Sequence, residues 1–186
     1  ISRLGDPEVL QLREVPDPRP GPGQVLVRVR SAGINFADIL MRMGLYQGAP
    51  PAPFVPGYEI AGEVEAAGPG AGSLKAGARV LAAVGFGGYA EKIVVPADRA
   101  IPIPEGKSFQ EAAALPVNYL TAYHALYVLG NLRRGGRVLV HGAAGGVGVA
   151  ALQLAHLRGA EVIGTASAAK HAFAKGQGAR HLIDPR

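Results

Sequence analysis

The sequence predicts an α/β fold in which a small β-rich domain precedes a parallel-sheet domain of the nucleotide-binding kind. Two observations lead to this prediction. Residues 1–104 contain many short strand patterns separated by glycine and proline turns, which is typical of a small barrel-like domain. Residues 137–165 then follow the order strand, glycine-rich turn, helix, strand, which is typical of a dinucleotide-binding βαβ unit.

The strands of the β-rich part are predicted by alternating or continuous apolar residues bounded by turn residues. A short helix is expected between the second and third strands. Asn35 stands where a helix N-cap is expected, Asp38 follows three residues later, and Gly44 is placed to end the helix. The expected strands are residues 9–15, 25–30, 60–66, 79–84 and 89–95.

Helical patterns replace strand patterns after residue 104. Ser108 and Glu111 form an S-x-x-E capping box in front of an alanine-rich helical turn. Pro116 interrupts that turn, and a longer helix over residues 117–129 is expected to end at Gly130. We therefore expect two domains, residues 1–110 and residues 111–186.

The glycine-rich turn is the strongest local signal. Residues 138–140 form a buried-strand pattern, and the pattern A-x-G-x-x-G from Ala143 to Gly148 follows directly. Helical spacing continues to Gly159, and a second strand pattern covers residues 161–165. A glycine turn can be a plain tight connection. The strands and helix around this one favour a pyrophosphate site, where backbone N–H groups and the helix N-terminus meet the phosphates.

Composition excludes several function classes. The chain has 186 residues, 48% of them hydrophobic, and no cysteine, so disulfides and thiolate metal sites are excluded. The five histidines show no metal-binding spacing, and we expect no metal. The net charge of +5 is scattered along the sequence, so we expect no nucleic-acid partner. Glycines and two histidines interrupt the most apolar stretch, residues 138–157, so we expect no integral membrane segment. The chain begins with Ile1 and ends soon after a strand-like start, and we expect it to be a fragment of a longer protein.

Several ordered segments carry a resemblance to a known family. They are GINFADIL, GLYQ, PGYEIAG, KAGARV, GGYAEKIVV, EAAALPVNYLTAYHAL, VLVHGAAGGVG and VIGTASAAKHA. In this order they closely resemble the zinc-free quinone oxidoreductases (ζ-crystallin/VAT-1-like) of the medium-chain dehydrogenase/reductase superfamily. The resemblance implies a GroES-like β-barrel domain, then a truncated Rossmann domain, an active-site cleft between them, and a cytoplasmic homodimer when complete.

The resemblance also indicates why no metal is expected. Zinc-dependent relatives carry a cysteine where this chain has Asn35 and a histidine where it has Tyr58, while Glu59 retains the acidic residue of that motif. Neither replacement is a credible zinc ligand here. Without a Lewis acid, alcohol oxidation is disfavoured. An acceptor that is already electrophilic, such as a quinone or an activated enone, is favoured.

The resemblance implies roles for individual residues, each with a simpler alternative. Asn35 is expected to line the nicotinamide site, although it also fits a helix cap. Tyr46 is expected to face cofactor and substrate, or to anchor its loop. Thr121 is expected to hydrogen-bond the nicotinamide, or to bond back to its own helix. The pyrophosphate is expected at Gly145, Gly146, Val147 and Gly148.

The end of the second strand predicts the cofactor. NAD-preferring sites commonly offer a carboxylate there for the ribose 2′-hydroxyl. This chain has Ser167 and Lys170 and no carboxylate, and a lysine can pair with a phosphate dianion. We therefore expect NADP(H) rather than NAD(H). The alternative is that Ser167 caps the next helix and that Lys170 is solvated.

These residues predict an NADPH-dependent, zinc-independent quinone oxidoreductase. Asn35 and Tyr46 are the expected catalytic residues, with a small-molecule quinone as hydride acceptor and the proton coming from solvent. Two alternatives remain open. One is NADPH-dependent reduction of α,β-unsaturated carbonyl compounds in the same cleft. The other is a VAT-1-like NADPH-binding module with little turnover.

Overall fold

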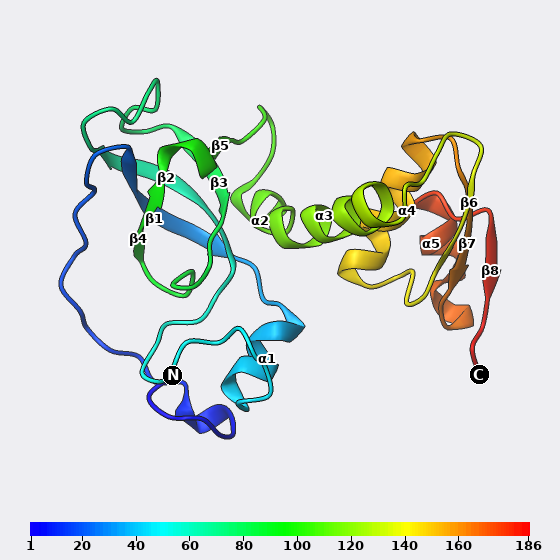
Figure 1. Ribbon diagram of the computed structural model, residues 1–186, viewed down its shortest axis with the longest axis horizontal. Helices are drawn as coiled ribbons and strands as arrows, with labels where there is room; N and C mark the ends of the chain where they lie inside the picture. Colours follow the sequence, from blue (N-terminus) through cyan, green and yellow to red (C-terminus); the bar gives the residue numbers. More distant parts are fainter. The chain divides into compact units, whose positions relative to one another are not determined.

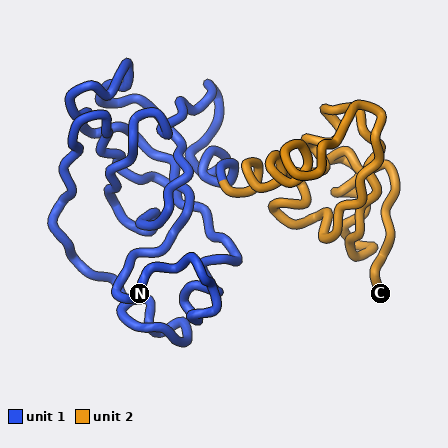
Figure 2. The backbone as a smooth tube through the Cα atoms, in the orientation of Figure 1, with its two compact units in different colours: residues 1–116 blue, residues 117–186 orange.

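The computed structural model describes all residues, 1–186. The chain forms two compact units, residues 1–116 and residues 117–186 (Figure 2). No helix is long and apolar enough to cross a membrane. The two units are described separately below.

The first unit is built on a five-stranded antiparallel sheet with the strand order β4-β1-β2-β3-β5 (Figure 1). Strand β1 pairs with both β2 and β4, so it lies inside the sheet. The strands are β1 (Gln24–Ala32), β2 (Glu59–Ala67), β3 (Arg79–Ala83), β4 (Lys92–Pro96) and β5 (Ile101–Pro102).

Both faces of this sheet are packed. Because successive residues of a strand point to opposite faces, Ile60 and Ala61 of β2 enter two different cores. Ile60 belongs to a valine-rich core with Val25, Val27 and Val80. Ala61 packs against helix α2 (Phe109–Ala113), whose alanines are small enough to lie close to the sheet. The sheet is therefore stabilised on one face by the valine-rich core and on the other by a helix.

One strand prediction in this unit, residues 9–15, was wrong, and another was wrong in extent. Residues 10–20 form no regular secondary structure, because no neighbouring strand hydrogen-bonds to them. Leu12 in this segment is fully exposed, and only Val9, in a short 3-10 helix (Pro7–Val9), is buried. Strand β4 begins at Lys92 rather than at residue 89. The other three predicted strands correspond to β1, β2 and β3.

Helix α2 starts with the capping box that the sequence predicts. The Ser108 hydroxyl accepts a hydrogen bond from the Glu111 backbone N–H at 3.1 Å, and the Glu111 carboxylate accepts one from the Ser108 backbone N–H at 2.9 Å. Lys107 adds an ion pair to Glu111 at 2.9 Å. These contacts satisfy N–H groups that an isolated helix start leaves unpaired.

Replacing Glu111 with glutamine is expected to reduce the loss of unfolding free energy that occurs as the pH falls below about 4.5. The Ser108 backbone N–H, the Lys107 ammonium and the Ser108 hydroxyl together lower the pKa of Glu111 to about 2. This pKa lies below the unperturbed value of 4.5, so the stabilisation is present above about pH 4.5 and is lost as the pH falls toward 2. Urea unfolding at neutral and acid pH measures it. Glu105→Gln, which changes an exposed glutamate outside the capping box, is the control, and equal pH profiles for both variants would contradict the prediction.

The second unit is a three-stranded parallel sheet with the order β6-β7-β8. Strand β6 (Arg137–Val140) leads through the glycine turn to α4 (Gly146–Leu157) and then to β7 (Glu161–Thr165). This confirms the predicted βαβ unit. A 3-10 turn (Ala168–Lys170), α5 (His171–Gly176) and β8 (His181–Ile183) complete the sequence.

The core of the second unit is built largely from small side chains. Ala150, Leu152 and Ala155 of α4 are fully buried against Val140 and Val162 of the sheet. Alanines let the helix lie close to the strands, and close packing of this kind stabilises the interior. The predicted fold class, α/β with a β-rich unit followed by a unit of parallel strands, is confirmed.

The helix predicted over residues 117–129 is present, and its two halves differ in helical type. Residues Pro116–Tyr123 form the α-helix α3, and His124–Leu129 continue it as a π-helical turn. The Gly130 N–H bonds to the carbonyl of Ala125, five residues back. The wider turn places Tyr127 where its hydroxyl donates to the Leu154 carbonyl of α4 at 2.6 Å.

Candidate functional site

The glycine turn between β6 and α4 is shaped by backbone contacts that exclude side chains. Gly145 is the N-cap of α4, and Gly146 begins the helix. A Cβ on Gly148 would lie 2.3 Å from the Gly142 carbonyl oxygen and 2.9 Å from Ala143 Cα. The first turn of α4 therefore packs directly against the turn that follows β6. Its leading N–H groups have no carbonyl one turn earlier in the helix to bond to.

Strand β7 holds the other side of this turn. The Ala143 N–H donates to the Thr165 carbonyl at 2.9 Å, and the Gly142 N–H donates to the Thr165 hydroxyl at 3.2 Å. Thr165 is the last residue of β7, at the carboxyl end of the parallel sheet. Ligands of open α/β sheets bind outside this end of the strands. The turn and the end of β7 thus form two sides of one site.

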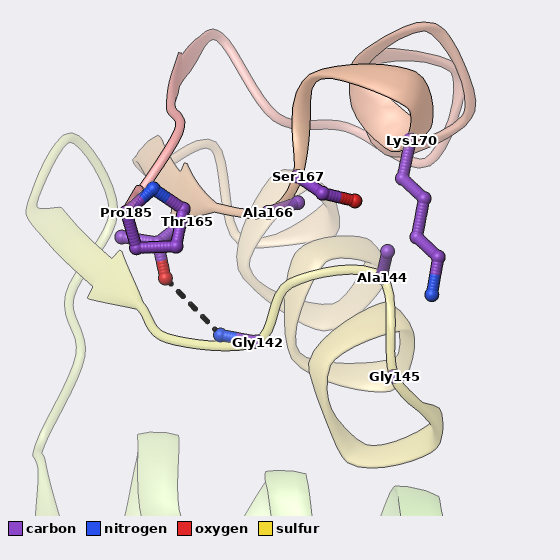
Figure 3. A pocket seen from close by; sticks show the side chains of 8 residues that line it. All are labelled: Gly142, Ala144, Gly145, Thr165, Ala166, Ser167, Lys170 and Pro185. Carbon is purple, nitrogen blue, oxygen red and sulfur yellow. Dashed lines mark hydrogen bonds between the residues drawn. The ribbon is translucent and has the colours of Figure 1, made fainter.

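A pocket with a volume of about 320 Å³ lies at this edge (Figure 3). It is formed by the glycine turn, the residues after β7 and one residue near the end of the chain. Three predicted site residues, Gly145, Ser167 and Lys170, line it. The remaining lining residues are Gly142, Ala144, Thr165, Ala166 and Pro185.

The pocket carries one charged side chain. Lys170 lies at the end of the 3-10 turn, and the Ser167 side chain points toward it beside Ala144 (Figure 3). None of the eight lining residues is acidic. The nearby carboxylate of Asp184 accepts the Ala168 backbone N–H at 2.9 Å and pairs with Arg186. The pocket is therefore suited to an anion beside a glycine turn.

The helix-cap alternative for Ser167 can be examined directly. Ser167 does occupy the N-cap position of the 3-10 turn, but its side chain makes no capping hydrogen bond. Its hydroxyl can therefore turn to a ligand in the pocket. Thr165 and Gly142, by contrast, were not predicted as pocket residues. The position of Thr165 at the end of the second strand was the available signal.

Of the other predicted residues of this unit, three follow Gly145 directly in the chain and one, Thr121, does not line the pocket. Gly146, Val147 and Gly148 form the first turn of α4, directly after Gly145. Thr121 is exposed on α3 and does not line the pocket.

In the first unit, Asn35 and its neighbours form a buried polar network. The Asn35 side-chain amide donates to Glu59 Oε1 at 2.9 Å, and the Asn35 backbone N–H donates to Asp38 Oδ2 at 2.8 Å. Glu59 is 1% exposed and Asp38 is 7% exposed. Asn35 is the N-cap of α1 (Phe36–Arg42), as expected. Its side chain, however, bridges to β2 and links the helix start to a buried carboxylate.

Tyr46 and Tyr58 form an aromatic pair in the same unit. Their ring centroids are 6.3 Å apart in an edge arrangement. Burial raises the pKa of Tyr58 well above its usual value, and the hydrogen bond to Tyr46 and the negative charge of Asp38 raise it further. Tyr58 thus stays protonated at neutral pH and can donate or relay a hydrogen bond. Tyr46 lies in the loop after α1, is partly exposed, and is positioned by this contact.

Tyr89 belongs to the network as a donor and was not predicted as one. Its hydroxyl donates to Asp38 Oδ2 at 2.8 Å. Burial raises the pKa of Tyr89, and the hydrogen bond to Asp38 adds to this effect. The second oxygen of Asp38 is buried with no hydrogen-bond partner. The Asp38 carboxylate consequently depends on the two donors at Oδ2.

Tyr89→Phe is expected to lower the free energy of unfolding by about 1–3 kcal/mol, because a buried carboxylate loses one of its donors. Tyr123→Phe is the matched control, since Tyr123 is half exposed and meets Tyr127 through its ring. Urea unfolding followed by circular dichroism measures both. Equal stability changes in the two variants would show that the Tyr89–Asp38 hydrogen bond contributes nothing.

A family model for the alcohol dehydrogenase GroES-like domain matches residues 21–105. This range covers all five strands of the first unit. The synaptic vesicle membrane protein VAT-1 homolog of Mus musculus is 52% identical over 176 residues, which is 94% of this chain and 43% of that protein. The chain spans about half the length of the curated relatives that it matches.

Solved structures agree with these relatives. The quinone oxidoreductase from Thermus thermophilus, solved also in complex with NADPH, has a TM-score of 0.86 and 43% identity, covering 97% of this chain and 57% of that one. The CurK enoyl reductase has a TM-score of 0.93 and 32% identity, covering 100% of this chain and 58% of that one.

Proposed function

This chain is a quinone oxidoreductase-like protein of the medium-chain dehydrogenase/reductase superfamily, and we propose that it serves NADPH-dependent hydride transfer to a quinone without zinc. In this proposal residues 1–110 are the substrate domain and residues 111–186 belong to the dinucleotide-binding domain. The protein is cytoplasmic and homodimeric in the same proposal.

The pocket of the second unit carries the cofactor part of the proposal. Its only charged lining residue is Lys170, Ser167 offers a hydroxyl, and no carboxylate lines it. A carboxylate would favour the ribose 2′-hydroxyl of NAD and repel a phosphate, whereas lysine and serine can bind a phosphate dianion. Gly145, Gly146, Val147 and Gly148 would hold the pyrophosphate with backbone N–H groups. The residues present therefore fit NADPH.

The first unit supplies the groups for the acceptor. NADPH supplies the hydride when bound, and solvent supplies the proton that completes the reduced quinone. Asn35 is held by its bond to Glu59, and Tyr46 by its contact with Tyr58, so both can position reactants without reorganising. Together with Thr121 they are the proposed contacts of the nicotinamide ring. No step of this reaction requires a metal ion, because a quinone accepts hydride unaided.

Two rival functions each have a specific observation behind them. The likeness to an enoyl reductase favours reduction of α,β-unsaturated carbonyl compounds. The 52% identity to a synaptic vesicle membrane protein VAT-1 homolog, whose name states no reaction, is the observation behind the alternative of an NADPH-binding module with little turnover. All three functions share the same cofactor, so the acceptor distinguishes them.

The test follows oxidation of NADPH and of NADH separately, with no metal added, against an ortho-quinone and against a 2-alkenal. Rapid oxidation of NADPH by the quinone supports the proposal. Turnover of the alkenal instead assigns the enone reductase, and tight NADPH binding with neither turnover assigns the binding module. Equal rates with NADH and NADPH would contradict the cofactor assignment.

A further inference from the structure

The Ser167 hydroxyl and the Lys170 ammonium belong to one short loop, so their placement depends on what holds that loop. Residues 166–170 leave the end of β7 and lead into α5, with the 3-10 turn Ala168–Lys170 in between. A serine in front of such a turn commonly directs its hydroxyl back to the N–H groups of the turn itself. The Ser167 side chain makes no such bond. The group that satisfies the start of the turn comes from another strand.

That group is the carboxylate of Asp184, the first residue after β8. Its Oδ2 accepts the backbone N–H of Ala168, the first residue of the turn, at 2.9 Å. A carboxylate is a stronger acceptor for an N–H than a neutral hydroxyl is. Asp184 therefore caps the turn from a neighbouring strand, and the Ser167 hydroxyl is left without this backbone partner.

The sheet itself brings Asp184 to the loop. Thr165, the last residue of β7, pairs with Ile183, the last residue of β8. The Ala166 N–H then donates to the Ile183 carbonyl at 3.1 Å, so the parallel ladder continues one residue past β7. The backbone hydrogen bonds therefore run as far as the residue before Ser167 on one strand and the residue before Asp184 on the other.

A histidine holds the loop from the side of α5. His171 is the first residue of that helix, and its Nε2 lies 2.9 Å from the Ala166 carbonyl oxygen. A carbonyl oxygen only accepts, so Nε2 carries the hydrogen and donates it. Ala166 is thus held through both its N–H and its carbonyl, and Ala168 is held by Asp184. Ser167 lies between these two fixed residues, and its side chain points into the pocket (Figure 3).

The negative charge of Asp184 is compensated outside the pocket. Its Oδ1 accepts the Arg186 backbone N–H at 3.1 Å, and the Arg186 guanidinium lies 3.4 Å from the same oxygen. The Arg186 side chain, followed by the Ala168 N–H, lowers the pKa of Asp184, so the carboxylate is charged at neutral pH. Asp184 does not line the pocket, although the next residue, Pro185, does. Any effect of Asp184 on a ligand must therefore act through the loop.

We propose that Asp184 is a positioning residue for NADPH, because its cap on the Ala168 N–H leaves the Ser167 hydroxyl free for the 2′-phosphate of the cofactor. The inference rests on the proposed binding of NADPH in this pocket and extends it to a residue outside the pocket. Without the cap, the Ser167 hydroxyl turns back to the backbone of its own turn and NADPH loses a partner. NADH has no 2′-phosphate, so its binding does not depend on the cap.

The test compares Asp184→Ala with Asp184→Asn by isothermal titration with NADPH and with NADH. Asp184→Ala removes both the acceptor and the charge, and should raise the Kd for NADPH about 5- to 10-fold, the equivalent of one hydrogen bond. Asp184→Asn removes the charge but keeps an oxygen that can accept the Ala168 N–H, so its Kd should stay within about twofold of the wild type. Neither variant should change the Kd for NADH.

Two further variants separate the cap from other effects. Asp98→Ala removes an equal charge from an exposed position in a 3-10 turn of the first unit (Ala97–Arg99), and should bind both cofactors as the wild type does. The double variant Asp184→Ala, Ser167→Ala should bind NADPH no more weakly than Ser167→Ala alone. In that background no hydroxyl remains for the uncapped turn to divert.

Four results would overturn the inference. One is an unchanged affinity of Asp184→Ala for NADPH. A second is an equal loss of NADH affinity, which would mean that the whole loop had collapsed. A third is tighter NADPH binding by both Asp184 variants, which would make the carboxylate a repelling charge. The fourth is a wild-type protein that binds neither cofactor, which would overturn the proposed function as well, whereas the first three leave that function standing.

Discussion

Gly148→Ala is expected to lower the free energy of unfolding by about 3 kcal/mol, because it overpacks a site closed by backbone. The added methyl would meet the Gly142 carbonyl oxygen at 2.3 Å and Ala143 Cα at 2.9 Å. Backbone atoms cannot rotate aside as a flexible side chain can. The start of α4 must then move away from the turn that follows β6, and NADPH binding is expected to be lost with it.

Gly176→Ala is the control for this substitution. Gly176 is the last residue of α5, and a Cβ there meets nothing within 4 Å. Alanine in a helix is favoured over glycine by about 0.5–1 kcal/mol, so this variant should be slightly more stable than the wild type. Urea unfolding and a fluorescence titration with NADPH measure the two effects. If the Gly148→Ala protein were as stable as the wild type, the turn would be able to accommodate a methyl group at this position, and the prediction would be wrong.

Lys170→Ala is expected to raise the Kd for NADPH by about 10- to 100-fold and to leave the Kd for NADH unchanged. The reason is the loss of a charge-assisted hydrogen bond to the 2′-phosphate, which NADH lacks. Lys170 is the one cation lining the pocket, so no neighbour can replace it. Ser167→Ala should act in the same direction with a smaller change, because a neutral hydroxyl contributes less.

Lys175→Ala is the matched control for Lys170→Ala. Lys175 lies on α5, is exposed and does not line the pocket, so the variant changes the net charge equally. Isothermal titration with each cofactor gives the four dissociation constants. If Lys170→Ala weakened NADH as much as NADPH, Lys170 would contact a part common to both cofactors. If Lys175→Ala matched it, only long-range charge would be involved.

The sequence predicted the second unit well because its contacts are local. Strand β6, the glycine turn, α4 and β7 follow one another, and each boundary is marked by a glycine or an apolar run. The π-helical turn at His124–Leu129 was not predicted, since apolar periodicity does not distinguish one helical hydrogen-bond pattern from another.

The first unit shows where pattern reasoning fails. Residues 9–15 alternate as a strand does, but a strand exists only where another one pairs with it. The same limit applies to the site. Asn35 was predicted from its position before a helix and from the resemblance, but its bond to Glu59 joins residues 24 apart in sequence. Tyr89 and Asp38 are 51 apart, and neither residue alone signals the pair.

The pairing of β1 has a consequence for how the chain folds as it is synthesised. Val25 of β1 pairs with Ala67 of β2 and with Val95 of β4, and Val80 of β3 pairs with Pro102 of β5, so the sheet of the first unit cannot be completed until residue 102 has been made. In the second unit, Arg137 pairs with Glu161, only a helix away. Closing long loops costs more entropy and slows folding. Strand β1 must therefore wait about 70 residues for its second partner strand, β4, whereas β6 can pair with β7 once the single helix between them has been made.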